Sequence, residues 1–135
     1  MNKLNEIQQK LSVPKNQRNT FGNYDYRSCE DILAAVKPLL GEATLILTDE
    51  LVCIGERYYI KSTAKLKDGD DVWSVDGFAR ESETKKGMDA SQITGSTSSY
   101  SRKYALNGLF LLDDVKDADT MDNREPAAPA KPTDF

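Results

Sequence analysis

Residues 57–81 read RYYIKSTAKLKDGDDVWSVDGFARE, and this stretch decides the fold. Along Arg57–Lys67 the side chains alternate between two faces, as they do in a β-strand. The face typical of a core consists of Tyr58, Ile60, Ser62, Ala64 and Leu66. The other face is basic and carries one aromatic ring; it consists of Arg57, Tyr59, Lys61, Thr63, Lys65 and Lys67. Asp68-Gly69-Asp70 is a strong hairpin signal, so the next strand is expected over Asp71–Glu81.

Two shorter strands are expected just before this pair. Thr44–Thr48 and Leu51–Ile54 have strand composition, and Asp49-Glu50 between them is interpreted as a turn. Gly55-Glu56 provides the following turn. Consecutive strands joined by short turns pair most simply as an antiparallel meander, here of about four strands.

The N-terminal third predicts two helices. The first covers Asn2–Leu11, and the polar segment Ser12–Tyr26 that follows it reads as a loop. Ser28, with Asp31 three residues later, is a capping-box signal for a helix over Cys29–Lys37. Pro38 disfavours helical geometry at the residue before it, so we expect the helix to end there.

After the strands, Ser82–Gly87 reads as a polar, basic loop, and a long helix is expected from Met88 to Leu112. Asp113–Phe135 is acidic and then rich in Pro and Ala, a composition typical of disorder. The fold class is therefore α+β, with a core domain over residues 1–112 and a tail over 113–135.

The net charge of −4 is unevenly distributed. Asp113–Phe135 holds seven acids and three bases, whereas residues 1–112 hold 15 of each. The core is thus neutral overall and can still carry a local basic surface, which matters more for nucleic-acid binding than the total charge.

Several classes of protein are disfavoured by composition. The chain has no histidine, which removes histidine-based catalysis and metal sites. The acids after Leu112 lack the spacing of a calcium loop, so no metal and no cofactor are expected. There is no signal-peptide pattern and no apolar run of membrane-spanning length, and Cys29 and Cys53 are expected to be reduced thiols of a cytoplasmic protein.

The long helix has two different faces and an arginine at the edge of the apolar one. Its apolar face consists of Ala105, Leu106, Leu109, Phe110 and Leu112. Tyr100, Lys103 and Asn107 share another face, with Tyr104 beside it. Arg102 lies one turn before Leu106, so its guanidinium must leave the core at an edge, in a groove or an interface.

Each of these features also has an ordinary structural explanation. The polar helix face and the basic strand face are compatible with plain solvent exposure. The small hydroxylated residues of Thr94–Ser101 could donate to phosphates or could allow tight packing on the sheet. Gly95-Ser96-Thr97 lacks the lysine of a phosphate-binding Walker loop.

Five stretches together resemble the Erf (essential recombination function) family of phage and prophage annealing proteins. They are NYDYRSCEDI over 23–32 with KPLL over 37–40, GMDASQITGS over 87–96, SYSRKYALNGLF over 99–110 and DDVKDADT over 113–120. The resemblance covers roughly residues 1–120, and the motif over 99–110 is the most specific.

The resemblance implies a non-enzymatic protein that binds single-stranded DNA and anneals complementary strands without ATP during phage or prophage recombination. It also implies ring or helical homo-oligomers, an antiparallel sheet followed by a long helix (the β-β-β-α type also seen in the eukaryotic ring-forming annealing protein), and DNA in a basic groove between sheet and helix. The implied location is the cytoplasm of a bacterial host, with no membrane partner and with a phage exonuclease or a host single-strand-binding protein as possible partners. The residues expected to bind DNA are Arg102, Lys103, Arg80, Lys85, Lys86, Lys61, Lys65, Tyr100, Tyr104 and Asn107.

Two other functions stay open from the sequence alone. A non-annealing single-strand-binding protein would need the five strands of an OB-fold, which the predicted strands before the long helix fit poorly. A metal-dependent nuclease would need clustered carboxylates, and none outside the acidic tail shows ligand spacing.

Overall fold

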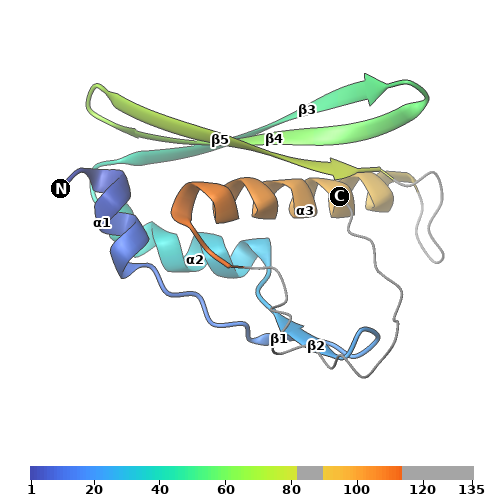
Figure 1. Ribbon diagram of the computed structural model, residues 1–135, viewed down its shortest axis with the longest axis horizontal. Coiled ribbons are helices and arrows are strands. Elements are labelled where there is room, and N and C mark those ends of the chain that lie inside the picture. Colours follow the sequence, from blue (N-terminus) through green and yellow to red (C-terminus); the bar gives the residue numbers. More distant parts are fainter. Residues whose placement is uncertain (82–89, 114–135) are drawn as a thin grey trace.

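The computed structural model describes residues 1–81 and 90–113. It confirms the α+β class (Figure 1). The elements in chain order are α1 (Lys3–Lys10), β1 (Gln17–Asn19), β2 (Tyr24–Tyr26), α2 (Cys29–Leu40), β3 (Thr44–Ile54), β4 (Arg57–Asp68), β5 (Asp71–Arg80) and α3 (Ala90–Phe110). The expected tail and Lys85 and Lys86 lie outside the described residues.

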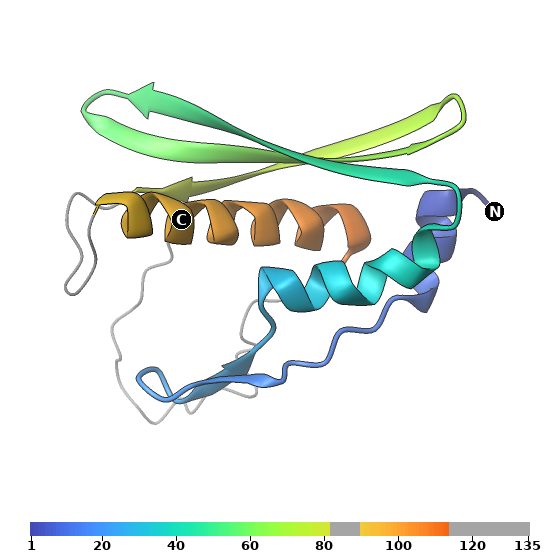
Figure 2. The ribbon, with the colours of Figure 1, turned by 180° about the vertical axis from the view of Figure 1, so that it is seen from behind.

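The main sheet has the order β3-β4-β5, with both pairs antiparallel. Its helices all lie against one face, and Figures 1 and 2 show the opposite face uncovered. The expected turn at Asp49-Glu50 is wrong, because β3 runs through both residues and they pair with Ser62 and Lys61 of β4. The meander therefore has three strands, and the side chain of Asp49 points toward α3, on the same face as Leu47 and Leu51.

Two further boundaries differ from expectation. The segment Ser12–Tyr26 contains the β1–β2 hairpin, whose turn is held by Asn19 accepting from the amides of Phe21 and Gly22. α2 continues through Pro38 to Leu40, because Leu39 and Leu40 pack against the core and offset the lost amide hydrogen bond. The capping box at Ser28 and Asp31 is present as predicted.

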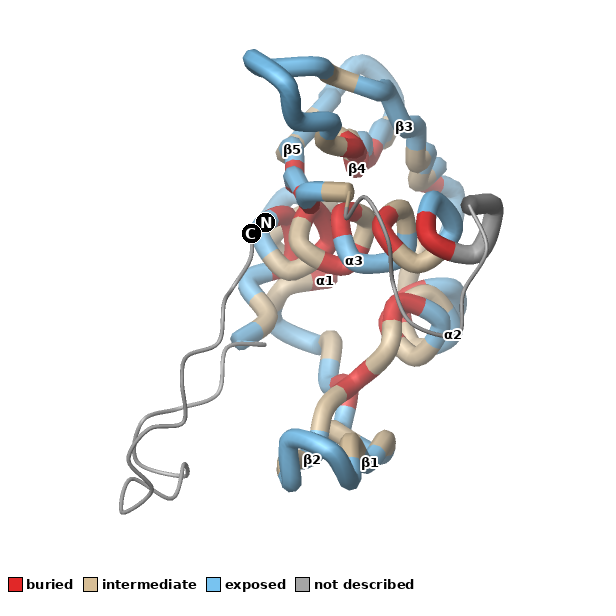
Figure 3. Tube along the Cα trace, turned by 90° about the vertical axis from the view of Figure 1, so that its right-hand side faces the viewer, coloured by how far each residue is buried: buried red, intermediate tan, exposed pale blue. Residues whose placement is uncertain are grey.

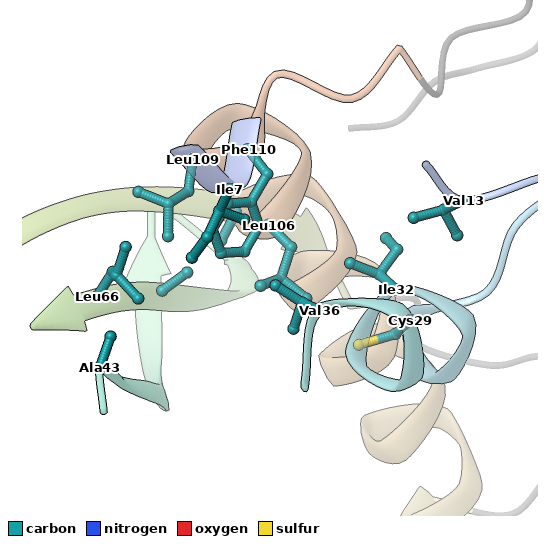
Figure 4. Packing of buried hydrophobic residues seen from close by; sticks show 12 residues of the cluster. Ile7, Val13, Cys29, Ile32, Val36, Ala43, Leu66, Leu106, Leu109 and Phe110 are labelled. Atoms are coloured by element: carbon teal, nitrogen blue, oxygen red, sulfur yellow. The ribbon is translucent and has the colours of Figure 1, made fainter. Parts of the chain in front are cut away.

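The core lies where α3 is layered between the sheet and the N-terminal helices, as the buried segments in Figure 3 show. Figure 4 shows Ile7 of α1, Val36 of α2 and Leu106 and Phe110 of α3 gathered there. Tyr58 was predicted to join the core but is 48% exposed. The end of the β3–β4 hairpin curves away from α3 (Figure 1), so α3 does not cover this ring.

Gly77 sets the position of α3 on the sheet. A Cβ at this residue would lie 2.5 Å from the carbonyl oxygen of Ser101 and no farther from the amide nitrogen of Ala105. Only glycine allows the helix backbone to lie directly on β5 at this point. The close approach brings the polar side chains of α3 within hydrogen-bonding distance of β3 and β4.

Candidate nucleic-acid interface

A planar ion pair joins α3 to β3 at the edge of the core. Arg102 Nε donates to Asp49 Oδ1 over 3.0 Å, and Nη2 donates to Oδ2 over 3.1 Å. This two-point contact fixes the guanidinium in one orientation. The Arg102 side chain is 38% exposed, so its remaining N–H groups are accessible to a ligand.

Serine hydroxyls complete the surroundings of Asp49. Ser62 donates to Asp49 Oδ1 over 2.7 Å and Ser98 donates to Oδ2 over 2.6 Å. Burial by itself would raise the pKa of Asp49, but the hydrogen bonds from Arg102, Ser98 and Ser62 hold that pKa below its usual value. The carboxylate is therefore ionised at neutral pH, and it positions Arg102.

The Ser/Thr-rich part of α3 mainly packs against its surroundings. Ser101 is fully buried, with its Oγ 2.6 Å from Ser62 Oγ, and Thr97 donates to the carbonyl of Ile93. These contacts support the packing explanation for Thr97, Ser98 and Ser101. Ser99 differs from them, because it lines a pocket.

Lys103 is buried rather than extended into solvent. It is only 7% exposed, and its Nζ donates to the carbonyl of Arg27 over 3.3 Å. The ammonium also lies 5.3 Å from the ring centre of Tyr26 and 5.1 Å from that of Tyr100, within cation–π range. Tyr104 stacks obliquely on Tyr100 at 6.2 Å. Lys103 thus connects β2, and Arg27 directly after it, to α3.

A pocket of about 170 Å³ opens beside this cluster, between α3 and the start of α2. Its lining residues are Tyr26, Ser28, Cys29, Glu30, Ser99, Tyr100 and Lys103. Burial, and then the charge of Glu30, raise the pKa of the Cys29 thiol, which keeps it protonated at neutral pH. The pocket therefore offers two aromatic rings, a cation, the carboxylate of Glu30 and no activated nucleophile.

Comparisons with known proteins agree with the motifs in α2 and α3. The family model for the ERF superfamily matches residues 1–134. The chain belongs to the ERF superfamily. It is 59% identical over 133 residues to the essential recombination function protein of Salmonella phage P22. That alignment covers 97% of this chain and 65% of the phage protein, so the chain spans about two-thirds of its relative's length. No solved structure matches.

In this ERF chain the predicted DNA-binding residues fall on two sides of the sheet. Arg102, Lys103, Tyr100 and Tyr104 belong to α3, on the covered side. Lys61, Lys65 and Arg80 alternate with the buried residues of β4 and β5, so they point to the uncovered face. Asn107 belongs to neither group of contacts, and its Oδ1 is buried without a hydrogen-bond partner in the described structure.

The sequence does not point to Asp49 or Tyr26 as residues of the candidate site. Asp49 was assigned to a turn, although Leu45, Leu47 and Leu51 continue the same alternation on either side of it. Tyr26 was assigned to a loop.

Within residues 1–81 and 90–113, no cluster of potential ligands could hold a metal ion. No helix in that part of the chain is long and apolar enough to cross a membrane.

Proposed function

We propose that this ERF chain binds single-stranded DNA and anneals complementary strands, without ATP, in phage or prophage homologous recombination. One observation carries the proposal. Arg102, which Asp49 holds in one orientation, is followed in α3 by Lys103, which lines the aromatic pocket. The similarity to the essential recombination function protein of phage P22 supports the recombination role.

The two parts of the site suit different parts of a DNA strand. The accessible N–H groups of Arg102 fit phosphate oxygens, and a guanidinium held in one orientation loses little entropy on binding. The pocket with Tyr26 and Tyr100 fits a single base or sugar against an aromatic ring. A site that engages few bases leaves the other bases free to pair, which annealing requires.

Assembly into homo-oligomers is part of the proposal. One chain of 15.1 kDa presents few cations to a long strand, and repeated copies would align them. β3 and β5 are the edge strands of the sheet, and such edges are suited to pairing with another copy.

A matched pair of variants tests the DNA contact. Asp49→Asn with Arg102→Gln removes both charges while leaving hydrogen-bonding groups at both positions. We expect weaker binding of a fluorescent oligothymidine and a salt dependence that is smaller by about 0.7 in logarithmic slope for one lost phosphate contact. Lys37→Ala, on the exposed side of α2, is the control for the loss of a cation.

Annealing is measured separately with complementary labelled oligonucleotides. Pairing that is accelerated by the wild-type chain without nucleotide supports annealing, whereas binding without acceleration would favour a plain single-strand-binding protein. Wild-type affinity and salt slope in the double variant would rule out Arg102 as a DNA contact.

A further inference from the structure

The uncovered face of the main sheet, here called the outer sheet face, has a composition of its own. The strand registers place on it, across three strands, Thr44, Ile46, Thr48, Glu50, Val52, Ile54, Arg57, Tyr59, Lys61, Thr63, Lys65, Lys67, Val72, Ser74, Asp76, Phe78 and Arg80. Five of these residues are basic and two are acidic, a surplus of three positive charges. The whole chain carries −4, so positive charge is concentrated on this face.

Most of these cations are available to a ligand. Lys61 lies between Glu50 at 3.8 Å and Asp76 at 3.9 Å, so the charge of this lysine is compensated and the trio is net negative. The other four bases have no ion pair in the part of the chain that the structure describes: Arg57, Lys65, Lys67 and Arg80. Arg57 and Arg80 lie toward one end of the face and Lys65 and Lys67 toward the other, with the trio of Lys61, Glu50 and Asp76 between these two basic groups.

Apolar and aromatic side chains lie among the charged residues of the outer sheet face. Phe78 is 39% exposed, and Ile46, Ile54 and Val72 are more exposed still. The register pairs Tyr59 with Arg80 and Lys61 with Phe78, which makes Tyr59 and Phe78 diagonal neighbours on adjacent strands. Two neighbouring rings on an open sheet, flanked by cations, can stack bases while the cations hold phosphates.

We propose that the outer sheet face is a second nucleic-acid-binding surface, which holds a single strand on Tyr59 and Phe78 with its phosphates on Lys65, Lys67 and Arg80. Protein interfaces are depleted of lysine in their centres, so a basic central strand favours DNA over a protein partner. The inference deepens the proposed function and rests on it. Together, the two proposals place two DNA strands on opposite faces of the main β-sheet.

The test compares three variants of the full chain. Lys65→Ala with Lys67→Ala removes two cations, Phe78→Leu removes a ring while keeping an apolar side chain, and Lys10→Ala with Lys37→Ala removes two exposed helical cations as a control. Donor- and acceptor-labelled oligothymidines, which cannot pair with each other, report by energy transfer when one assembly holds two strands. Light scattering measures the mass of the assembly in parallel.

For the wild type and the control we expect two classes of binding. In the lysine variant the weaker class should bind with lower affinity and with a salt slope smaller by about 1.4 for two lost phosphate contacts, and Phe78→Leu should weaken that class several-fold. Unchanged two-strand occupancy in the lysine and Phe78 variants would overturn the proposal. So would a changed assembly mass with unchanged DNA binding, because the face would then be a protein contact.

The variant Asp49→Asn with Arg102→Gln, here called the groove variant, distinguishes this proposal from the DNA contact at Arg102 under the proposed function. If the groove variant binds oligothymidine normally while the lysine variant loses all binding, the outer sheet face is supported as a DNA-binding surface and the contact at Arg102 is ruled out. If the groove variant loses all binding and the lysine variant loses none, the contact at Arg102 is supported and the outer sheet face is ruled out as a DNA-binding surface.

Discussion

Gly77 of β5 lies against the backbone of Ala105 in α3 so closely that a methyl group has no room between them. This contact fixes the height of the helix above the sheet. It thereby sets the distance between Arg102 and Asp49, which meet from opposite sides of the same interface.

Gly77→Ala should therefore destabilise the protein. The added methyl group must displace α3 backbone, and overpacking of this kind costs about 1–3 kcal/mol or more in unfolding free energy. Urea denaturation followed by circular dichroism measures the change. Gly95→Ala is the matched control, because a Cβ there meets nothing within 4 Å, and it should stabilise α3 by roughly 0.5–1 kcal/mol. Equal effects at the two glycines would contradict the close packing.

The ion pair predicts a specific acid sensitivity. Because the folded-state pKa of Asp49 is lower than its unfolded value, ionised Asp49 stabilises the fold above the unfolded pKa, and this contribution is lost as pH falls through the folded one. The stability difference between the wild type and Asp49→Asn should be greatest above pH about 5 and should shrink below pH about 4. Urea midpoints at several pH values test this, and a difference that stays constant with pH would rule out the linkage.

Lys103 should contribute to stability as well as to any DNA contact. Lys103→Ala removes the stem and ammonium that lie near Tyr26 and Tyr100, and it removes the donor to the Arg27 carbonyl. We expect a loss of about 1–3 kcal/mol in unfolding free energy. Lys103→Met keeps the stem and should recover part of that loss. A fully stable Lys103→Ala variant would contradict the buried position.

The two free thiols should react at very different rates. Cys53 is exposed at the end of the β3–β4 hairpin, whereas Cys29 is 7% exposed and has a raised pKa. A thiol-specific chromogenic reagent should modify Cys53 quickly in the native chain and Cys29 much more slowly, with both reacting quickly after unfolding. Cys53→Ser should abolish the fast phase. A fast phase that survives this substitution would place Cys29 in contact with solvent.

Local signals in the sequence predicted most of the elements correctly. The capping box at Ser28, the hairpin at Asp68-Gly69-Asp70 and the alternation along β4 each depend on residues close together in the chain, so no distant contact is needed to interpret them. Where a distant contact matters, the predictions are wrong. The core holds α2 beyond Pro38, and the partners on α3 keep Asp49 in a strand.

Periodicity along the chain predicts the α+β class, the order of the main elements and the two-faced character of β4, because it reports which residues share a face. It does not report which face another element covers. The packing of α3 is needed to see that Lys61, Lys65 and Arg80 lie across the sheet from Arg102, that Lys103 is buried between two tyrosines, and that Asp49 orients Arg102. Each of these facts follows from the docking of α3 on one side of the sheet, and that docking depends on contacts between residues far apart in the chain.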